Sequence, residues 1–229
     1  MIELIPAIDI IGGKCVRLTK GDYSRKTVYN DDPVAQAKEF EDKGFTRLHV
    51  VDLDGAKSKH IVNDAVLRQI TAQTHLTVDF GGGIKSSDDI EKAFDAGASL
   101  VTVGSIAVSN PDLFISWLGT FGAEHIILGA DARNGKVSIN GWKEDSEEDL
   151  LPFLKKYIIA GVRNVLCTDI SKDGTLQGPA TNYTSASWLP IRASTSSLRA
   201  VYHRMKTSTT SRKRAFRQSC SAKPTTKDD

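Results

Sequence analysis

The feature that most constrains the fold is a repeated alternation of short apolar runs with amphipathic stretches over the first 180 residues. Parallel strands that are buried on both faces read as nearly continuous apolar runs. Strands that alternate with helical patterns indicate a parallel α/β fold. The predicted strands are Glu3–Asp9, Arg47–Leu53, Leu76–Phe80, Leu100–Val103, His125–Asp131 and Asn164–Asp169.

Helix start signals fall between these strands. Asp32-Pro33 and Asn110-Pro111 each place a capping side chain before a proline at the first helical position. Ser86 or Ser87 is expected to cap a third helix. A fourth predicted helix begins with the acidic run Ser146–Asp149, because acids favour the positive end of a helix, and continues to about Ala160.

The chain also contains an internal repeat. Ile5–Asp9 resembles Ile127–Asp131, and Val50–Gly55 resembles the segment that begins at Leu166. Fixed spacing between similar segments indicates structural repeats. The repeat therefore predicts two related half-barrels, the second beginning near residue 125.

Length and composition limit the class of protein. A chain of 229 residues fits one large domain, and no apolar run approaches the length of a membrane span. The N-terminus lacks the pattern of a signal peptide, so we expect a cytoplasmic protein with no membrane partner. The three cysteines and five histidines show no disulfide or metal-ligand spacing, so no metal site is expected.

The formal charge of +2 conceals an asymmetry. Residues 182–229 hold ten Lys/Arg against two acids, which leaves 20 basic and 26 acidic residues in the first 181. Such a basic segment is typical of a nucleic-acid-binding arm or a disordered tail. It is rich in Ser, Thr and Arg, contains no convincing strand, and lacks the apolar content of a core.

Glycines follow two neighbouring predicted strands. Gly81–Gly83 lead from one strand into a helix, and Gly104 with Ser105 follow the next strand. Glycine lets the backbone approach an anion, and a helix N-terminus favours negative charge. These residues predict a phosphate-binding cup, although the same glycines would also suit tight turns without a ligand.

Asp9 and Asp131 each end an apolar strand, at matching positions of the repeat. A carboxylate at such a position is costly to desolvate. Because the carboxyl ends of barrel strands form the active face, both side chains would reach one site, where two carboxylates can act as acid and base. Ion pairs with Arg17 or Arg133 are the structural alternative.

Two further segments carry candidate site residues. Thr168 and Asp173 belong to a polar loop that ends the sixth strand, although an Asp-Gly turn would explain that loop equally well. Trp142 follows the fifth strand, where its ring is expected either to cover a ligand or to pack on the barrel rim.

Several segments together resemble the phosphoribosylformimino-5-aminoimidazole carboxamide ribotide isomerase family of histidine biosynthesis. They are Ile5–Asp9, Gly13–Leu18, His49–Ala56, Gly81–Gly83, Gly141-Trp142 and Thr168–Gly178. The resemblance covers about the first 180 residues and implies a (β/α)8 TIM barrel, here about six βα units followed by an irregular basic tail. It also implies an Amadori rearrangement, in which an aminoaldose becomes an aminoketose, with no cofactor.

The resemblance implies roles for individual residues. Asp9 matches the catalytic base of the family and Asp131 its acid. The implied substrate-binding residues are Arg17, Asp52, Gly82, Gly83, Gly104, Ser105, Trp142, Thr168 and Asp173. The sister cyclase of the pathway carries a cysteine before the first aspartate, so Ala7 favours the isomerase.

The resemblance stops near Thr181, which suggests a shift of reading frame. In a frame shifted by one base, each new codon consists of the third base of one codon and the first two bases of the next. Read in this way, the DNA for residues 197–208 can encode a second Gly-rich loop that leads into a helix. The same operation on residues 221–229 permits a segment that resembles the eighth-strand loop of the family. We therefore interpret residues 1–180 as the barrel body and 181–229 as a frameshifted tail.

This interpretation has structural consequences. Without two units the barrel cannot close, so we expect the first and sixth strands to keep unpaired edges and the chain as written to be poorly soluble and nearly inactive. The partner is expected to be a small bis-phosphorylated substrate, with a monomeric protein and no nucleic acid. The alternatives are the sister cyclase and a barrel-like protein whose basic tail binds nucleic acid.

Overall fold

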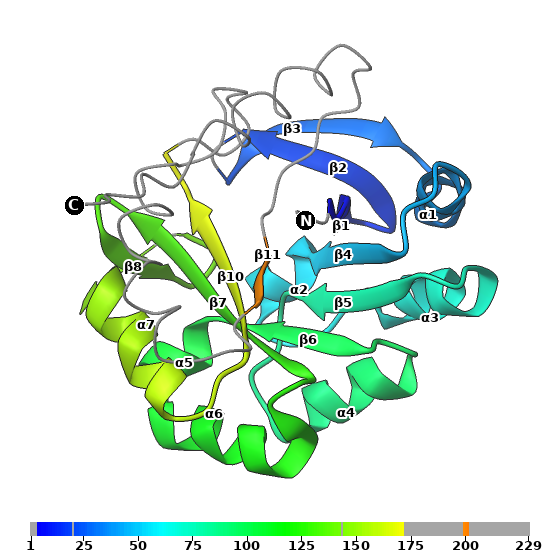
Figure 1. The fold of residues 1–229 in the computed structure, drawn as a ribbon. Helices are drawn as coiled ribbons and strands as arrows, with labels where there is room; N and C mark the ends of the chain where they lie inside the picture. Colours follow the sequence, from blue (N-terminus) through cyan, green and yellow to red (C-terminus); the bar gives the residue numbers. More distant parts are fainter. Residues whose placement is uncertain (1–3, 20, 143, 172–198, 202–229) are drawn as a thin grey trace, which may run out of the picture.

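The computed structural model describes residues 4–19, 21–142, 144–171 and 199–201, so Asp173 and most of the predicted tail lie outside the described residues. Parallel strands pair side by side in the order β11-β10-β7-β6-β5-β4-β1. These strands are β1 (Ala7–Ile11), β4 (Arg47–Asp52), β5 (Thr77–Gly81), β6 (Leu100–Val103), β7 (Ile126–Arg133), β10 (Asn164–Asp169) and β11 (Arg199–Val201). The sheet curls and carries helices on its outer side, the layout of a partial (β/α)8 barrel (Figure 1).

The helices begin where local capping allows. Asp32 caps α1 by accepting from two backbone N–H groups, and Asn110 caps α6 by accepting from the N–H of Leu113. Ser86 caps α4 in a reciprocal capping box with Asp89. The helices are α1 (Pro33–Asp42), α2 (Leu53–Ser58), α3 (Asp64–Gln73), α4 (Ser87–Asp95), α5 (Ser105–Ser109), α6 (Pro111–Trp117), the π-helical turn η1 (Leu118–Gly122) and α7 (Leu150–Ile159).

Two antiparallel excursions interrupt the alternation of strand and helix. They comprise β2 (Lys14–Thr19) and β3 (Asp22–Asn30) after β1, and β8 (Lys136–Ile139) and β9 (Glu144–Asp149) after β7. A helix and a parallel strand follow each excursion, so the two segments share one element order. The origin of this order in two half-barrels stays a prediction.

The predicted start of the fourth helix is wrong. The acidic run Ser146–Asp149 belongs to β9, which pairs with β8, and α7 begins only at Leu150. Pairing with β8 fixes these residues in extended backbone and overrides their preference for a helix N-terminus. Pro152 lies in the first turn of α7, where proline is tolerated.

Two expectations about the sheet edges are also wrong. A strand does form beyond residue 180, because β11 pairs in parallel with Asn164–Leu166 of β10. The first strand pairs with β2 through Asp9–Ile11 on the side away from β4. The first strand and the first half of the sixth strand, Asn164–Leu166, therefore lack the unpaired edges that the sequence predicted.

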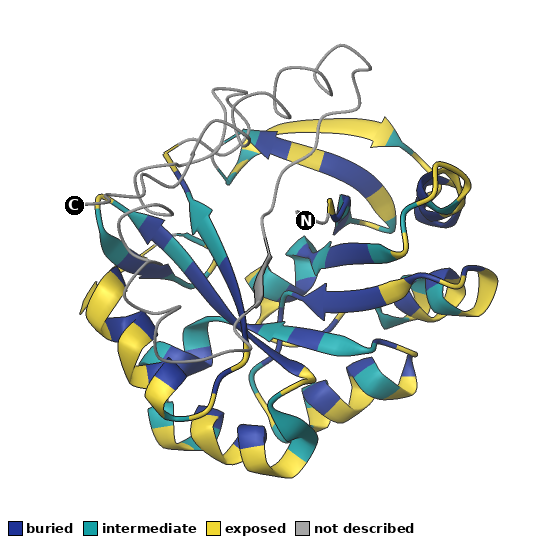
Figure 2. Ribbon diagram, in the orientation of Figure 1, coloured by how far each residue is buried: buried dark blue, intermediate teal, exposed yellow. Residues whose placement is uncertain are grey.

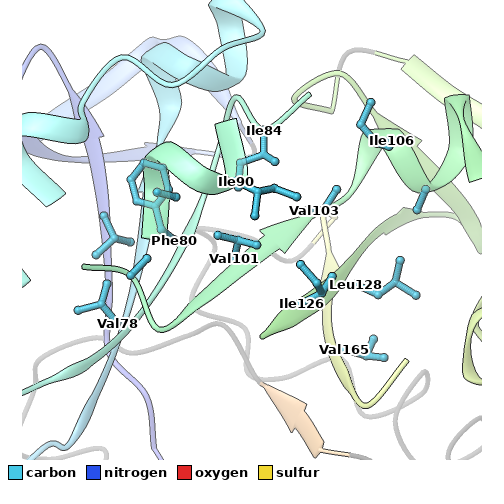
Figure 3. Close-up of a cluster of buried hydrophobic side chains, with 14 of the residues drawn as sticks. Val78, Phe80, Ile84, Ile90, Val101, Val103, Ile106, Ile126, Leu128 and Val165 are labelled. Atoms are coloured by element: carbon cyan, nitrogen blue, oxygen red, sulfur yellow. The ribbon is translucent and has the colours of Figure 1, made fainter. Parts of the chain in front are cut away.

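The parallel strands separate two apolar layers. The larger layer fills the space between sheet and helices and includes Phe80, Ile90, Val101 and Leu128 (Figure 3). The helices turn buried faces toward it and exposed faces toward solvent (Figure 2). The smaller layer lies on the other face of the sheet and consists of Ile5, Leu100, Ile127 and Leu166. Within the described residues, no helix has the length and apolar character needed to span a bilayer.

The outer layer predicts where truncation is costly. Ile90 of α4 is fully buried in it, whereas Ile159 of α7 is 77% exposed. Ile90→Ala should lower the free energy of unfolding by about 2–5 kcal/mol, because it leaves a cavity in a packed layer. Ile159→Ala, the matched control, should change it by less than about 0.5 kcal/mol. Urea unfolding of both variants checks this, and equal losses would contradict it.

Candidate active site

Asp9 and Asp131 lie on the inner face of the curved sheet. Their sequence neighbours Ile8, Ile10 and Ala130 pack in the outer apolar layer, and side chains alternate between the faces of a strand. Both aspartates therefore point to the opposite, inner side. They do not end their strands as predicted, because each strand continues two residues further, to Ile11 in β1 and Arg133 in β7.

Asp131 is held by neighbouring polar groups. The indole Nε1–H of Trp142 donates to Asp131 Oδ2 at 2.8 Å, and the side chain of Thr168 also hydrogen-bonds to the carboxylate. Burial raises the pKa of Asp131, while Trp142, Thr168 and His49 act in the opposite direction. A carboxyl group that retains its proton toward neutral pH is suited to act as an acid.

The alternative ion pair between Asp131 and Arg133 does not form. Arg133 instead contacts Asp145 at 3.4 Å and donates to the backbone carbonyl of Trp142 at 3.1 Å. The guanidinium thus holds the Trp142 loop rather than the carboxylate. Asp131 keeps a pKa set mainly by burial, because Arg133 is not among the groups that perturb it.

Trp142 is fixed by a close contact as well as by its hydrogen bond. Its backbone is left-handed, with a φ of +67°. A Cβ atom on Gly21 would lie only 2.5 Å from Cε3 of the indole, so the ring packs directly against the turn between β2 and β3. This contact joins the two antiparallel excursions next to Asp131. It is consistent with the prediction that Trp142 lies at the site.

A buried pair that the sequence reasoning missed lies on the same inner face. His49 Nδ1 hydrogen-bonds to Asp79 Oδ1, and Thr102 Oγ1 donates to the same oxygen at 3.2 Å. Burial alone would lower the pKa of His49, but Asp79, followed by Asp9 and Asp131, raises it. The missed signal was the placement of a histidine and an aspartate inside apolar strands, where a polar residue needs a partner.

Asp52 organises a loop with both of its carboxylate oxygens. It is fully buried and accepts from the backbone N–H groups of Gly55, Val62 and Asn63, each at 2.8 Å, and from Asn63 Nδ2 at 2.6 Å. These four bonds fix the connection from β4 to α3. The side chain that the sequence assigned to substrate binding therefore acts within the scaffold in this structure.

Gly82 and Gly83 pack against that loop. Both have positive φ, and a Cβ atom would lie 2.1 Å from the carbonyl oxygen of Asp52 or 2.5 Å from that of His60, respectively. Only glycine fits such close backbone contacts. The tight-turn interpretation thus has a clear physical basis, and the phosphate cup stays a prediction.

Part of the expected anion site is already occupied by the chain itself. Asp89 accepts from the backbone N–H groups of Lys85 and Ser86 at 3.0 Å each, and Ser86 Oγ accepts from Asp89 N. The backbone donors of Lys85, Ser86 and Asp89 are therefore satisfied within the chain. A phosphate here would depend on the backbone of the glycines themselves.

The remaining predicted site residues are distributed around the inner face. Thr168 of β10 is in register with Asp131, and Ser105 Oγ accepts from Asn140 N at 3.4 Å. Gly104 approaches the backbone of Gly129, and Arg17 is exposed on β2. Among the described residues, no group of three or more His, Cys, Asp or Glu side chains could hold a metal ion.

A curved parallel sheet, helices on its outer side and paired carboxylates on its inner face define an α/β-barrel enzyme. The comparison with protein families agrees with this class. The chain belongs to the family described as histidine biosynthesis protein, whose model matches residues 3–195. The family expected from the motifs is thereby confirmed.

Individual relatives are similar over most of the chain. A protein from Phocaeicola vulgatus is 62% identical over 180 residues, which cover 79% of this chain and 75% of the relative. Relatives from Parabacteroides distasonis and Bacteroides thetaiotaomicron are each 59% identical with the same coverage. All three carry the name 1-(5-phosphoribosyl)-5-((5-phosphoribosylamino)methylideneamino) imidazole-4-carboxamide isomerase.

The raised pKa of Asp131 predicts a pH-dependent loss of stability. Because the folded chain holds this proton more tightly than the unfolded chain, stability is full below the ordinary value of 3.8 and falls as pH rises toward the folded pKa. Asp131→Asn removes that loss, so the variant should be more stable than the parent at pH 7 and their difference should shrink toward pH 4. Urea unfolding across this range tests the sign.

Asp95 is exposed, so Asp95→Asn is the control for the loss of a carboxylate. Its effect on stability should be smaller, because water screens exposed charges. An Asp131→Asn variant that is less stable than the parent at pH 7 would show that the carboxylate stabilises the fold instead.

Proposed function

We propose that this site catalyses an intramolecular aldose–ketose isomerisation, the Amadori rearrangement of the bis-phosphorylated imidazole carboxamide ribotide intermediate of histidine biosynthesis. The observation that carries the proposal is a pair of inner-face carboxylates, of which Asp131 has a raised pKa and a hydrogen bond from Trp142. The names of the relatives support isomerisation over the cyclisation performed by the sister enzyme.

The two carboxyl groups divide the chemistry. Asp131, as the acid, protonates the ring oxygen of the aminoaldose, and the bond between C1 and that oxygen breaks to give an open-chain Schiff base. Asp9, as the base, removes the proton from C2, and the electron pair forms the enolamine. A proton then adds to C1 and the C2 hydroxyl loses its proton, which gives the C2 carbonyl of the aminoketose. General acid–base catalysis of this kind contributes about 10²–10⁴ in rate per group.

Other side chains would position the substrate. Thr168 and Trp142 already contact Asp131, so both can align the acid with the ring oxygen. Gly82, Gly83, Gly104 and Ser105 would supply backbone and hydroxyl donors to one phosphate. Asp173 lies outside the described residues, and the second Gly-rich loop, which would bind the other phosphate, is present only in the alternative reading frame. Arg17 is the candidate cation on the β2 side of the site.

The chemistry uses only side chains and needs no cofactor in this proposal. We propose a monomer that acts on a small-molecule substrate, without nucleic acid as a partner, in the cytoplasm. The barrel body would be residues 1–180, built from two half-barrels, and residues 181–229 would be the frameshifted tail. The nucleic-acid-arm alternative gains no support from the family to which the chain belongs.

Asp9→Asn tests the base. In a chain with turnover, the variant should lose at least about 10²-fold in kcat, because the amide cannot accept the C2 proton, while the dissociation constant of the substrate changes little. Steady-state kinetics and calorimetric titration measure the two quantities. Asp95→Asn is the matched control on the outer surface. Normal kcat in Asp9→Asn would remove Asp9 from the mechanism.

Restoring the reading frame tests the tail. A chain whose residues 181–229 are replaced by the alternative frame should be more soluble and should isomerise the substrate, whereas the chain as written should be nearly inactive. Sedimentation of lysates and the isomerase assay compare the two. DNA codons across 181–229 that are incompatible with the alternative frame, or equal activity of both chains, would contradict the interpretation.

A further inference from the structure

The inner face contains one buried ionisable pair that the proposed acid–base steps do not use. His49 is 4% exposed and Asp79 is 1% exposed. They lie side by side on β4 and β5, in register with each other, and His49 is also in register with Ala7 of β1. Asp9 is two residues beyond Ala7 on the same face, so the pair lies directly beneath the candidate base.

The contacts favour a charged pair over a neutral one. Asp79 Oδ1 receives hydrogen bonds from His49 Nδ1 and Thr102 Oγ1, whereas Asp79 Oδ2 is buried with no hydrogen-bond partner among the described residues. A buried carboxylate that lacks part of its hydrogen bonds is costly unless a positive charge lies beside it. The imidazolium of His49 is placed to supply that charge.

Carboxyl groups face His49 from three neighbouring parts of the sheet. Asp79 comes from β5, Asp9 from β1 and Asp131 from β7, and each raises the pKa of the imidazole against the effect of burial. The hydroxyl-bearing Thr102 of β6 bonds to the pair but does not titrate near neutral pH. Without a cation here, the carboxylates of Asp79 and Asp9 would share a poorly solvated face with no opposite charge, which is unfavourable.

We propose that His49, held by Asp79, is a positioning residue that keeps a positive charge near both Asp9 and Asp131 and thereby sets the pH range in which they act as base and acid. This role rests on the proposed isomerase function. The charge favours the ionised form of Asp9, which a base requires. It also limits how far burial raises the pKa of Asp131, so that the acid can still release its proton.

The first experiment measures the charge on His49 and needs no turnover. Histidine carbons are labelled in the full 229-residue chain, and their NMR signals are followed against pH, with His49→Gln used to assign the signal. His49 should titrate above the ordinary value of about 6.5. In Asp79→Asn its pKa should fall by about one unit or more, because the opposite charge is gone.

Two controls separate charge from general disturbance. Thr102→Val removes a hydrogen bond from the same carboxylate oxygen but leaves its charge, so the pKa of His49 should fall less than in Asp79→Asn. His125, whose Nδ1 contacts the Ser99 carbonyl, serves as an internal reference, and its titration should not move in either variant.

The second experiment follows kcat and KM against pH in the frame-restored chain. Loss of the cation raises the pKa of both Asp9 and Asp131, so His49→Gln should shift both limbs of the kcat profile to higher pH. Asp79→Asn lowers the pKa of His49, so its profile should show the same shift only above that lowered pKa, where the imidazole has lost its proton. kcat near pH 6 should fall more than KM rises. His49→Gln removes the positive charge itself, whereas Asp79→Asn removes the negative charge that holds the proton on His49, so agreement between them does not depend on either one alone folding well.

The outcomes distinguish the role from its alternatives. A His49 pKa at or below the ordinary value in the parent chain, or one unchanged in Asp79→Asn, would overturn the proposal. A lower kcat with unmoved limbs would mean a purely structural role and would also overturn it. If His49 titrates as expected but the frame-restored chain shows no isomerisation, the proposed function fails and the catalytic role of the pair fails with it.

Discussion

The alternation of side chains along the parallel strands is the constraint on which the site depends. On β7, Ile126, Leu128 and Ala130 pack under the helices, whereas Ile127 and Asp131 face inward. A slip of one residue would exchange these two sets, placing a carboxylate in the outer apolar layer and an isoleucine at the site. The register of six neighbouring strands therefore fixes both the apolar layers and the positions of Asp9 and Asp131.

Much of this arrangement could be predicted from local signals. Buried parallel strands have a distinctive apolar composition, and the caps at Asp32, Ser86 and Asn110 act within a few residues of where they are written. The antiparallel excursions could not be predicted in the same way. β3 is largely exposed and β9 is almost wholly polar, so neither has the apolar alternation of a half-buried strand. Their extended form depends on pairing with β2 and β8.

In the candidate site, too, some features follow from local sequence signals and others depend on contacts between distant segments. Asp9 and Asp131 could be identified because the repeat places them at matching positions of two similar strands. The loop contacts of Asp52 could not be predicted, since a carboxylate at a strand end has the same sequence pattern whether it binds a substrate or a loop. Its partners Val62 and Asn63 lie ten and eleven residues further along the chain. The pair of His49 with Asp79 likewise requires the register between two strands, which the sequence does not contain explicitly.

In the described part of the chain, the strands that carry the candidate site are not all paired to the same extent. Asp9, His49, Asp79 and Asp131 lie on strands that are paired on both sides. Thr168 does not have the same support, because β11 pairs only with Asn164–Leu166, and among the described residues the end of β10 pairs only with β7. The groups proposed as acid and base are therefore held by strands with two neighbours. In the proposed function, the alignment of the substrate would also depend on the edge beyond β10. A chain can thus retain the electrostatics of this active site and still lack the rigid positioning that catalysis requires.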